Sequence, residues 1–124
     1  MSTITIVIVE DEEELRENLL DLLEFKGYNV IAYGSAEAFL EKIESLSADL
    51  VLCDHQLPGI NGIDALPEMK RIKPNLPVAI VTASCQKDTF EEALERGAER
   101  IIHKPYEQME MLQAVEEMLN KASV

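Results

Sequence analysis

Residues that can take part in chemistry follow four short apolar runs of this chain. They are Asp11, Asp54, Thr82 and Lys104, and Glu10 adds a further acid directly before Asp11. If the four runs are neighbouring parallel strands, these side chains meet at one edge of a sheet, which is where open α/β proteins bind ligands. The sequence therefore predicts one polar site built from carboxylates, a hydroxyl and an ammonium group.

Three acids at one sheet edge require positive charge. At about 4 Å and an effective dielectric near 20, each pair of like charges costs roughly 4 kcal/mol. Lys104 can neutralise one carboxylate, and a hard divalent cation can neutralise the others, because Mg²⁺ binds carboxylates together with phosphate oxygens. A magnesium-assisted phosphate site is one hypothesis, and a Lys104 salt bridge among solvated acids is the alternative. Thr82 either donates to a phosphoryl oxygen or serves as a turn or cap residue.

The elements that must position these residues alternate along the chain. Apolar, β-branched runs predict strands, and apolar residues at helical spacing predict helices. The predicted strands cover residues 4–9, 29–33, 49–54, 78–82 and 101–104. The predicted helices cover residues 13–25, 62–72 and 107–121, with one more between Ser35 and Ile43 and one between Asp88 and Gly97.

Local signals mark where several helices begin and end. Gly27 can adopt the left-handed conformation that ends the first helix, and Ser35 is an N-cap for the second. Asp88, with a glutamate three residues later, resembles a capping box. Pro67 removes a backbone donor inside the third helix, which predicts a kink or a late start.

Five strand-helix units in strict alternation indicate an α/β fold, a doubly wound parallel sheet with helices on both faces. For five strands, the flavodoxin-like order 2-1-3-4-5 places the switch point between the first and third strands. The ends of those two strands carry Asp11 and Asp54.

The composition limits the class of protein. The length of 124 residues, of which 47% are hydrophobic, predicts a single domain over residues 1–124. The 24 acids and 11 bases give a net charge of -13, which disfavours direct binding of nucleic acid or anionic membranes. Neither a signal peptide nor a membrane span is apparent, so we expect a cytoplasmic protein. Cys53 and Cys85 form no disulfide framework, and Cys53 is expected to be a small core residue.

Motifs along the whole chain resemble the receiver domain of two-component response regulators. They are residues 6–12 (IVIVEDE), 54–62 (DHQLPGING), 82–83 (TA), 97–98 (GA) and 104–105 (KP). Each motif alone is weak, but their order and spacing together make the resemblance specific.

The resemblance implies a phosphoacceptor signalling domain. Asp54 matches the aspartate that accepts a phosphoryl group from a histidine kinase or phosphotransfer protein, and Thr82 and Lys104 match the groups that hold the phosphoryl oxygens. The switch would then change contacts with an output domain or target protein. Because phosphoryl transfer depends mainly on positioning and charge neutralisation, these groups suffice for the receiver to assist its own modification, without being an enzyme for other substrates.

The resemblance also implies a metal site. Glu10 and Asp11 match the acidic pair that binds Mg²⁺ beside Asp54, and the backbone carbonyl of Gln56 matches a further ligand. Mn²⁺ is an alternative ion. Since the chain ends within a few residues of the predicted last helix, we expect no output segment in this sequence, which is either a stand-alone regulator or a receiver from a longer protein.

Three residues need separate comment. Glu10 stands where the family usually has aspartate, and its longer side chain can still reach a metal. Ile101 stands where many receivers have an aromatic residue that moves on phosphorylation, so the signal is expected to propagate differently. His55 follows Asp54 and, by the alternation of side chains, is expected to point away from it as a loop histidine; His103 is interpreted in the same way.

Two other functions compete with phosphoacceptor signalling. A dehalogenase-like (HAD-like) phosphohydrolase also uses a strand-end aspartate with Mg²⁺, but it needs a second aspartate two residues later, where this chain has Gln56. A pseudo-receiver would keep the fold and work without phosphate. Glu10 and Ile101 favour that alternative, whereas the full set of Asp54, Thr82 and Lys104 argues against it.

Overall fold

Five parallel strands form one sheet in the order β2-β1-β3-β4-β5, as the alternating pattern predicts. The computed structural model describes residues 3–122. The strands are β1 (Thr5–Val9), β2 (Asn29–Tyr33), β3 (Leu50–Asp54), β4 (Val78–Thr82) and β5 (Arg100–His103). The α/β, flavodoxin-like fold class is thereby confirmed.

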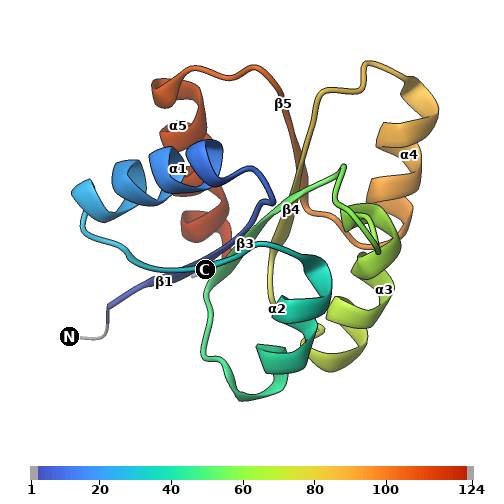
Figure 1. Ribbon diagram of the computed structural model, residues 1–124, viewed down its shortest axis with the longest axis horizontal. Helices are drawn as coiled ribbons and strands as arrows, with labels where there is room; N and C mark the ends of the chain where they lie inside the picture. Colours follow the sequence, from blue (N-terminus) through green and yellow to red (C-terminus); the bar gives the residue numbers. More distant parts are fainter. Residues whose placement is uncertain (1–2, 123–124) are drawn as a thin grey trace.

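Helices cover both faces of this sheet. One face carries α1 (Glu13–Phe25) and α5 (Gln108–Ala122), which lie beside each other in Figure 1. The other face carries α2 (Ala36–Lys42), a short 3-10 helix η1 (Ile43–Ser45), α3 (Gly62–Ile72) and α4 (Lys87–Glu95). None of the helices within residues 3–122 has the length and apolar character needed to cross a membrane.

The sheet separates two apolar clusters. Along β1, Ile6 and Ile8 face α1 and α5, whereas Val7 and Val9 face the other helices, because successive side chains of a strand point to opposite faces. Every residue of β3 and of β4 is buried. Burial on both faces explains why these strands are apolar almost throughout, and Cys53 is a core residue, as predicted.

The strand register brings the carboxyl ends of the strands to one edge. Val9 is opposite Cys53, so the residue after β1 is level with the last residue of β3. Asp54 is opposite Val81, and Thr82 is opposite His103. The side chains predicted to form the site therefore leave the sheet on neighbouring strands.

Several helix boundaries agree with the sequence signals. Both α1 and α3 span the predicted residues, and Gly27 has a φ of 95° after the end of α1. The Ser35 hydroxyl caps α2 by accepting a hydrogen bond from the Ala38 amide at 3.1 Å. The late start that Pro67 suggested for α3 is wrong, because Asn61 caps the helix directly before Gly62 and accepts from the Asp64 amide at 2.9 Å. The alternative of a kink at Pro67 stays a prediction.

The predicted capping box at Asp88 is also wrong. Helix α4 begins one residue earlier, at Lys87, and Asp88 lies in its first turn. The Ser84 hydroxyl accepts a hydrogen bond from the Gln86 amide at 3.1 Å, and this turn leads the chain into the helix before Asp88 can act as a cap.

Four other elements have boundaries that differ from the prediction by one residue. Strands β1 and β3 begin one residue later than predicted, and α5 begins at Gln108. Strand β5 covers Arg100–His103, so Lys104 directly follows the strand and does not belong to it. Here the apolar pair Ile101 and Ile102 gave the correct strand but not its ends.

Candidate functional site

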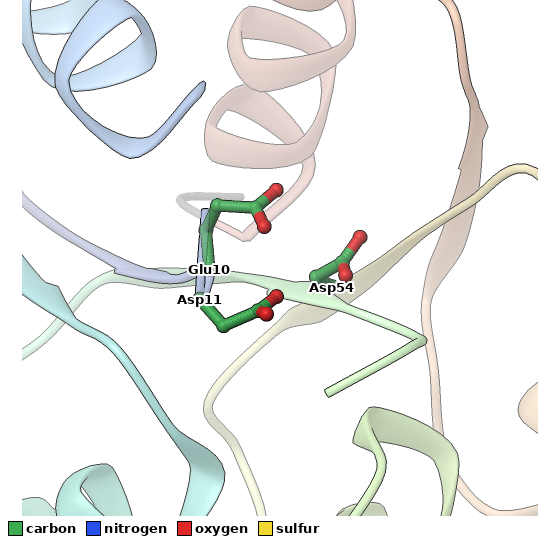
Figure 2. A group of neighbouring side chains, drawn as sticks. All are labelled: Glu10, Asp11 and Asp54. Atoms are coloured by element: carbon green, nitrogen blue, oxygen red, sulfur yellow. The ribbon is translucent and has the colours of Figure 1, made fainter. Parts of the chain in front are cut away.

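Three carboxylates converge at the carboxyl edge of the sheet (Figure 2). Glu10 and Asp11 follow β1, and their carboxylates point to the side on which Asp54, the last residue of β3, lies. One oxygen from each of the three side chains lies within 4.8 Å of the other two. Glu10 and Asp54 are buried, whereas Asp11 is exposed.

Lys104 joins two of these acids. Its Nζ lies 2.6 Å from Asp54 Oδ1 and 3.0 Å from Glu10 Oε1. The Lys104 amide also donates to the Thr82 carbonyl at 2.7 Å, and the Lys104–Pro105 peptide bond is cis. One ammonium group thus faces three carboxylates, and the site has an excess of negative charge.

The pKa values reflect this excess. Burial raises the pKa of Asp54 to about 6; the hydrogen bond from Lys104 opposes this shift, and repulsion from Glu10 and Asp11 adds to it. Burial alone would lower the pKa of Lys104, but its hydrogen bonds to Asp54 and Glu10 outweigh this effect and raise it. Additional positive charge near Asp54 would therefore stabilise its ionised carboxylate.

Backbone contacts fix the loop that carries the acidic pair. Arg16 on α1 donates from Nη1 to the carbonyl of Glu10 at 2.9 Å and to that of Asp11 at 3.3 Å. The Glu12 amide donates to Glu10 Oε2 at 3.2 Å. This role of Arg16 was not predicted, because its position five residues after Asp11 gives only a weak signal in the sequence.

Thr82 lies at the end of β4, almost completely buried. Its Oγ1 accepts a hydrogen bond from the Ser84 amide at 3.0 Å, and the Nδ1 atom of His55 lies 2.9 Å from the same oxygen. Within residues 3–122 the Thr82 hydroxyl has no hydrogen bond to Asp54. Thr82 thus belongs to the same edge as the acids but is held by other partners.

His55 lies in the loop after β3, as predicted, but its imidazole also contacts Thr82. His55 is half-buried, and burial lowers the pKa of its imidazole. The interpretation of His103 as a loop histidine is wrong, because His103 is the last residue of β5, where its Nε2 lies 3.1 Å from Cys85 Sγ. Both contacts join residues far apart in the sequence, and alternation along a strand carries no information about them.

The loop after β3 contains Gln56, whose backbone carbonyl is the predicted further ligand. Gln56 lies two residues beyond Asp54 and is exposed, and within residues 3–122 its carbonyl accepts no hydrogen bond. The Gly62 amide donates to the His55 carbonyl at 2.9 Å, and a Cβ atom at Gly62 would collide with the Asp54 carbonyl. Glu37 on α2 accepts a hydrogen bond from the Ile60 amide at 3.0 Å.

The donor atoms of the cluster suit a hard divalent cation. All the side-chain donors are carboxylate oxygens, which Mg²⁺ and Mn²⁺ favour. The alternative of solvated acids around a lysine does not describe Glu10 and Asp54, whose side chains are only 8% and 7% exposed.

Comparisons with known proteins give one consistent result. The sequence model of the response regulator receiver domain matches residues 6–116. The chain is 35% identical to the chemotaxis protein CheY of Thermotoga maritima, over 95% of this chain and 96% of that protein. It also resembles a crystal structure of a CheY-like receiver domain protein from Methanospirillum hungatei JF-1, with a TM-score of 0.94, 29% identity and 98% coverage of both chains.

Longer regulators match over part of their length. The chain is 32% identical to the transcriptional regulator NtrC of Azospirillum brasilense and 30% identical to FixJ of Bradyrhizobium diazoefficiens. These matches cover 97% and 94% of this chain but only 25% and 57% of those proteins.

Proposed function

We propose, because this chain belongs to the family of response regulator receiver domains, that Asp54 is the residue that accepts its phosphoryl group. Receiver domains are phosphoacceptor signalling domains. The observation that carries the assignment to Asp54 is its carboxylate, buried within the acidic cluster and only 2.6 Å from the Lys104 ammonium group. We further propose that the receiver domain comprises residues 1–124.

The proposed reaction is an in-line displacement at phosphorus. A carboxylate oxygen of Asp54 forms a new O–P bond while the P–N bond of a phosphohistidine breaks, and the departing imidazole nitrogen keeps the electron pair. Lys104 neutralises charge on the phosphoryl oxygens, and the Thr82 hydroxyl donates to one of them. Asp54 must be ionised to attack, and the nearby ammonium group favours that form.

A divalent cation, Mg²⁺ or Mn²⁺, would be held by Glu10, Asp11, Asp54 and the Gln56 carbonyl. These oxygen donors fit such an ion, and the Gln56 carbonyl accepts no hydrogen bond within residues 3–122 that it would have to give up. When bound, the ion supplies positive charge to the carboxylates and phosphoryl oxygens. Lys104 contacts Glu10 Oε1, so Glu10 would bind the ion through Oε2, or the ion would replace Lys104 at Oε1.

The partners follow from this role. We propose a histidine kinase or phosphotransfer protein as the donor and an output domain or a separate target protein as the receiver of the signal, in the cytoplasm. Ile101, half-buried on β5, packs against the cluster beneath α2, α3 and α4. Without an aromatic side chain there, Thr82 and the surrounding loops carry the change in contacts, by a shift between existing conformations.

Mass spectrometry of the intact protein tests the assignment. Acetyl phosphate and Mg²⁺ should add one phosphoryl group, mapped to Asp54, and Asp54→Asn should abolish the addition. Asp21→Asn, at an exposed position on α1, is the matched control and should label like the wild type. Equal labelling of Asp54→Asn would reject Asp54 as acceptor, whereas a wild type that neither labels nor binds Mg²⁺ would favour a pseudo-receiver.

A further inference from the structure

We propose that His55 is a positioning residue that competes with the phosphorylated Asp54 for the hydroxyl proton of Thr82. This inference rests on the proposed function of Asp54 and adds a residue that sets how readily the site accepts a phosphoryl group. The observation behind it is the contact of 2.9 Å between His55 Nδ1 and Thr82 Oγ1.

The backbone holds His55 in place on both sides. Its amide donates to the Val81 carbonyl at 2.8 Å, and its carbonyl accepts from the Gly62 amide at 2.9 Å. The first bond continues the pairing of β3 with β4, which lie side by side in Figure 1, and the second ties His55 to the start of α3. The imidazole thus emerges from a fixed backbone directly beside the end of β4.

The hydrogen-bond capacity of Thr82 fixes the direction of the contact. A threonine hydroxyl has one proton to donate and two lone pairs that accept. The Ser84 amide uses one lone pair, and within residues 3–122 the only acceptor in reach of the hydroxyl proton is His55 Nδ1. If Nδ1 carried the proton, an almost completely buried hydroxyl would be left without an acceptor, which is unfavourable. We therefore assign the imidazole proton to Nε2, with Thr82 donating to Nδ1.

This assignment places two acceptors in competition. The proposed role of Thr82 is to donate its hydroxyl proton to a phosphoryl oxygen on Asp54, and in the assignment above that same proton is donated to His55 Nδ1 across the 2.9 Å contact. Since the hydroxyl has only one proton, the two hydrogen bonds exclude each other. His55 thus stabilises the unphosphorylated arrangement, and the site must break this bond before Thr82 can hold the phosphoryl group.

Two nearly isosteric substitutions separate hydrogen bonding from packing. In His55→Asn the side-chain amide can replace Nδ1 as the acceptor, whereas in His55→Leu a side chain of similar shape has no polar atom. Beryllofluoride, which mimics a phosphoryl group on a carboxylate, is the probe, titrated with Mg²⁺ present. We expect His55→Leu to bind it roughly two- to tenfold more tightly, the equivalent of one lost hydrogen bond, and His55→Asn to bind like the wild type.

The Thr82→Val variant tests whether the effect of His55→Leu depends on the Thr82 hydroxyl. In Thr82→Val, replacing His55 by Leu should leave beryllofluoride affinity unchanged, because no hydroxyl proton remains to compete for. Unchanged or weaker binding by His55→Leu in the wild-type background, or equal shifts for the Leu and Asn variants, would overturn the competition. An equal effect of His55→Leu with and without Thr82 would overturn it as well.

Nuclear magnetic resonance tests the hydrogen bond without phosphate or metal. The ¹⁵N signals of His55 should show an unprotonated Nδ1 in the wild type, and the Nδ1 signal should shift in Thr82→Val. A protonated Nδ1 would refute the assignment. If the expected signals appear but the wild type binds no beryllofluoride, the proposed function has failed and the competition with it, although the hydrogen bond itself is real.

Discussion

Two lysines at opposite edges of the sheet have the same exposure and different surroundings. The side chains of Lys70 and Lys104 are each 20% exposed. Near the amino edge, Lys70 contacts one acid, Glu99, at 2.9 Å, and that acid is 40% exposed and also accepts from the Val78 amide. At the carboxyl edge, Lys104 contacts two buried acids, Glu10 and Asp54, with Asp11 close by.

The difference separates an ion pair with balanced charges from the proposed phosphorylation site. At Lys70 each charge has its partner, and the pair joins α3 to the chain before β5. At Lys104 three acids outnumber the single cation, and two of them, Glu10 and Asp54, are shielded from water, so like charges remain close together without full compensation. Uncompensated buried charges of this kind are typical of functional sites, and here they suit the proposed binding of a cation and a phosphoryl group.

Replacing each lysine by methionine should give the largest difference, measured as the rate of phosphorylation. Lys104→Met should slow phosphorylation of Asp54 by acetyl phosphate about 100-fold or more, because it removes a charge that stabilises the transferring group. Lys70→Met, which keeps a similar apolar stem, should leave that rate unchanged. Time-resolved intact-mass measurements at fixed Mg²⁺ give both rates. Equal slowing in the two variants would contradict the distinction between the Lys104 site at the carboxyl edge and the Lys70 ion pair at the amino edge.

Neutralising an acid should have opposite effects at the two edges. With metal removed by EDTA at pH 7.5, Asp54→Asn should increase the free energy of unfolding by on the order of 2 kcal/mol, since it removes a buried charge among like charges. Glu99→Gln should decrease it by about 1 kcal/mol, because it weakens a satisfied pair. Urea denaturation measures both values, and a loss of stability in Asp54→Asn would show that Lys104 already compensates the site.

The pH dependence should sharpen this result. The folded protein raises the pKa of Asp54 to about 6 from its ordinary value of 3.8, so the folded state binds this proton more tightly. The stability from protonation is fully present below about pH 4 and is lost as the pH rises through about 6. The advantage of Asp54→Asn over the wild type should therefore be largest above pH 7 and disappear near pH 4. An advantage that is constant with pH would exclude Asp54 ionisation as its cause.

The smallest expected effect concerns the exposed member of the cluster. Asp11→Asn should weaken Mg²⁺ binding about tenfold, because the ion loses a charged oxygen ligand. Without metal, it should change the stability little, since Asp11 is exposed. A titration of the thermal midpoint with Mg²⁺ measures the affinity, with Asp21→Asn as the control. Wild-type affinity in Asp11→Asn would remove Asp11 from the proposed ligands.

Local patterns in the sequence predicted the elements that depend on local interactions. Helices α1 and α3, strand β4 and the Ser35 cap agree with the structure, because apolar spacing and cap residues act within a few positions. The Asp88 signal failed because the chain already turns at Ser84 and the helix begins at Lys87, before Asp88. Strand order could be predicted because few topologies suit five alternating units.

The sequence predicted which strand ends form the site, but not every contact within it. Strand ends at one edge imply that Glu10, Asp11, Asp54 and Lys104 meet, and they do. The pairing of His55 with Thr82 joins residues 27 positions apart, and it depends on the rotation of two side chains that no periodicity specifies. The hydrogen bond from Arg16 to the Glu10 carbonyl was not predicted, because charged residues are common on the exposed side of a helix and most of them have no such role.

Gly62 supplies no functional group, yet it limits how this site can vary. Its backbone lies so close to the Asp54 carbonyl that even one methyl group would displace the end of β3. A mutagenesis library restricted to the polar residues would therefore omit a position at which substitution is expected to be least tolerated. Transplanting the acceptor site into another scaffold would have to carry this steric requirement along with the reactive side chains.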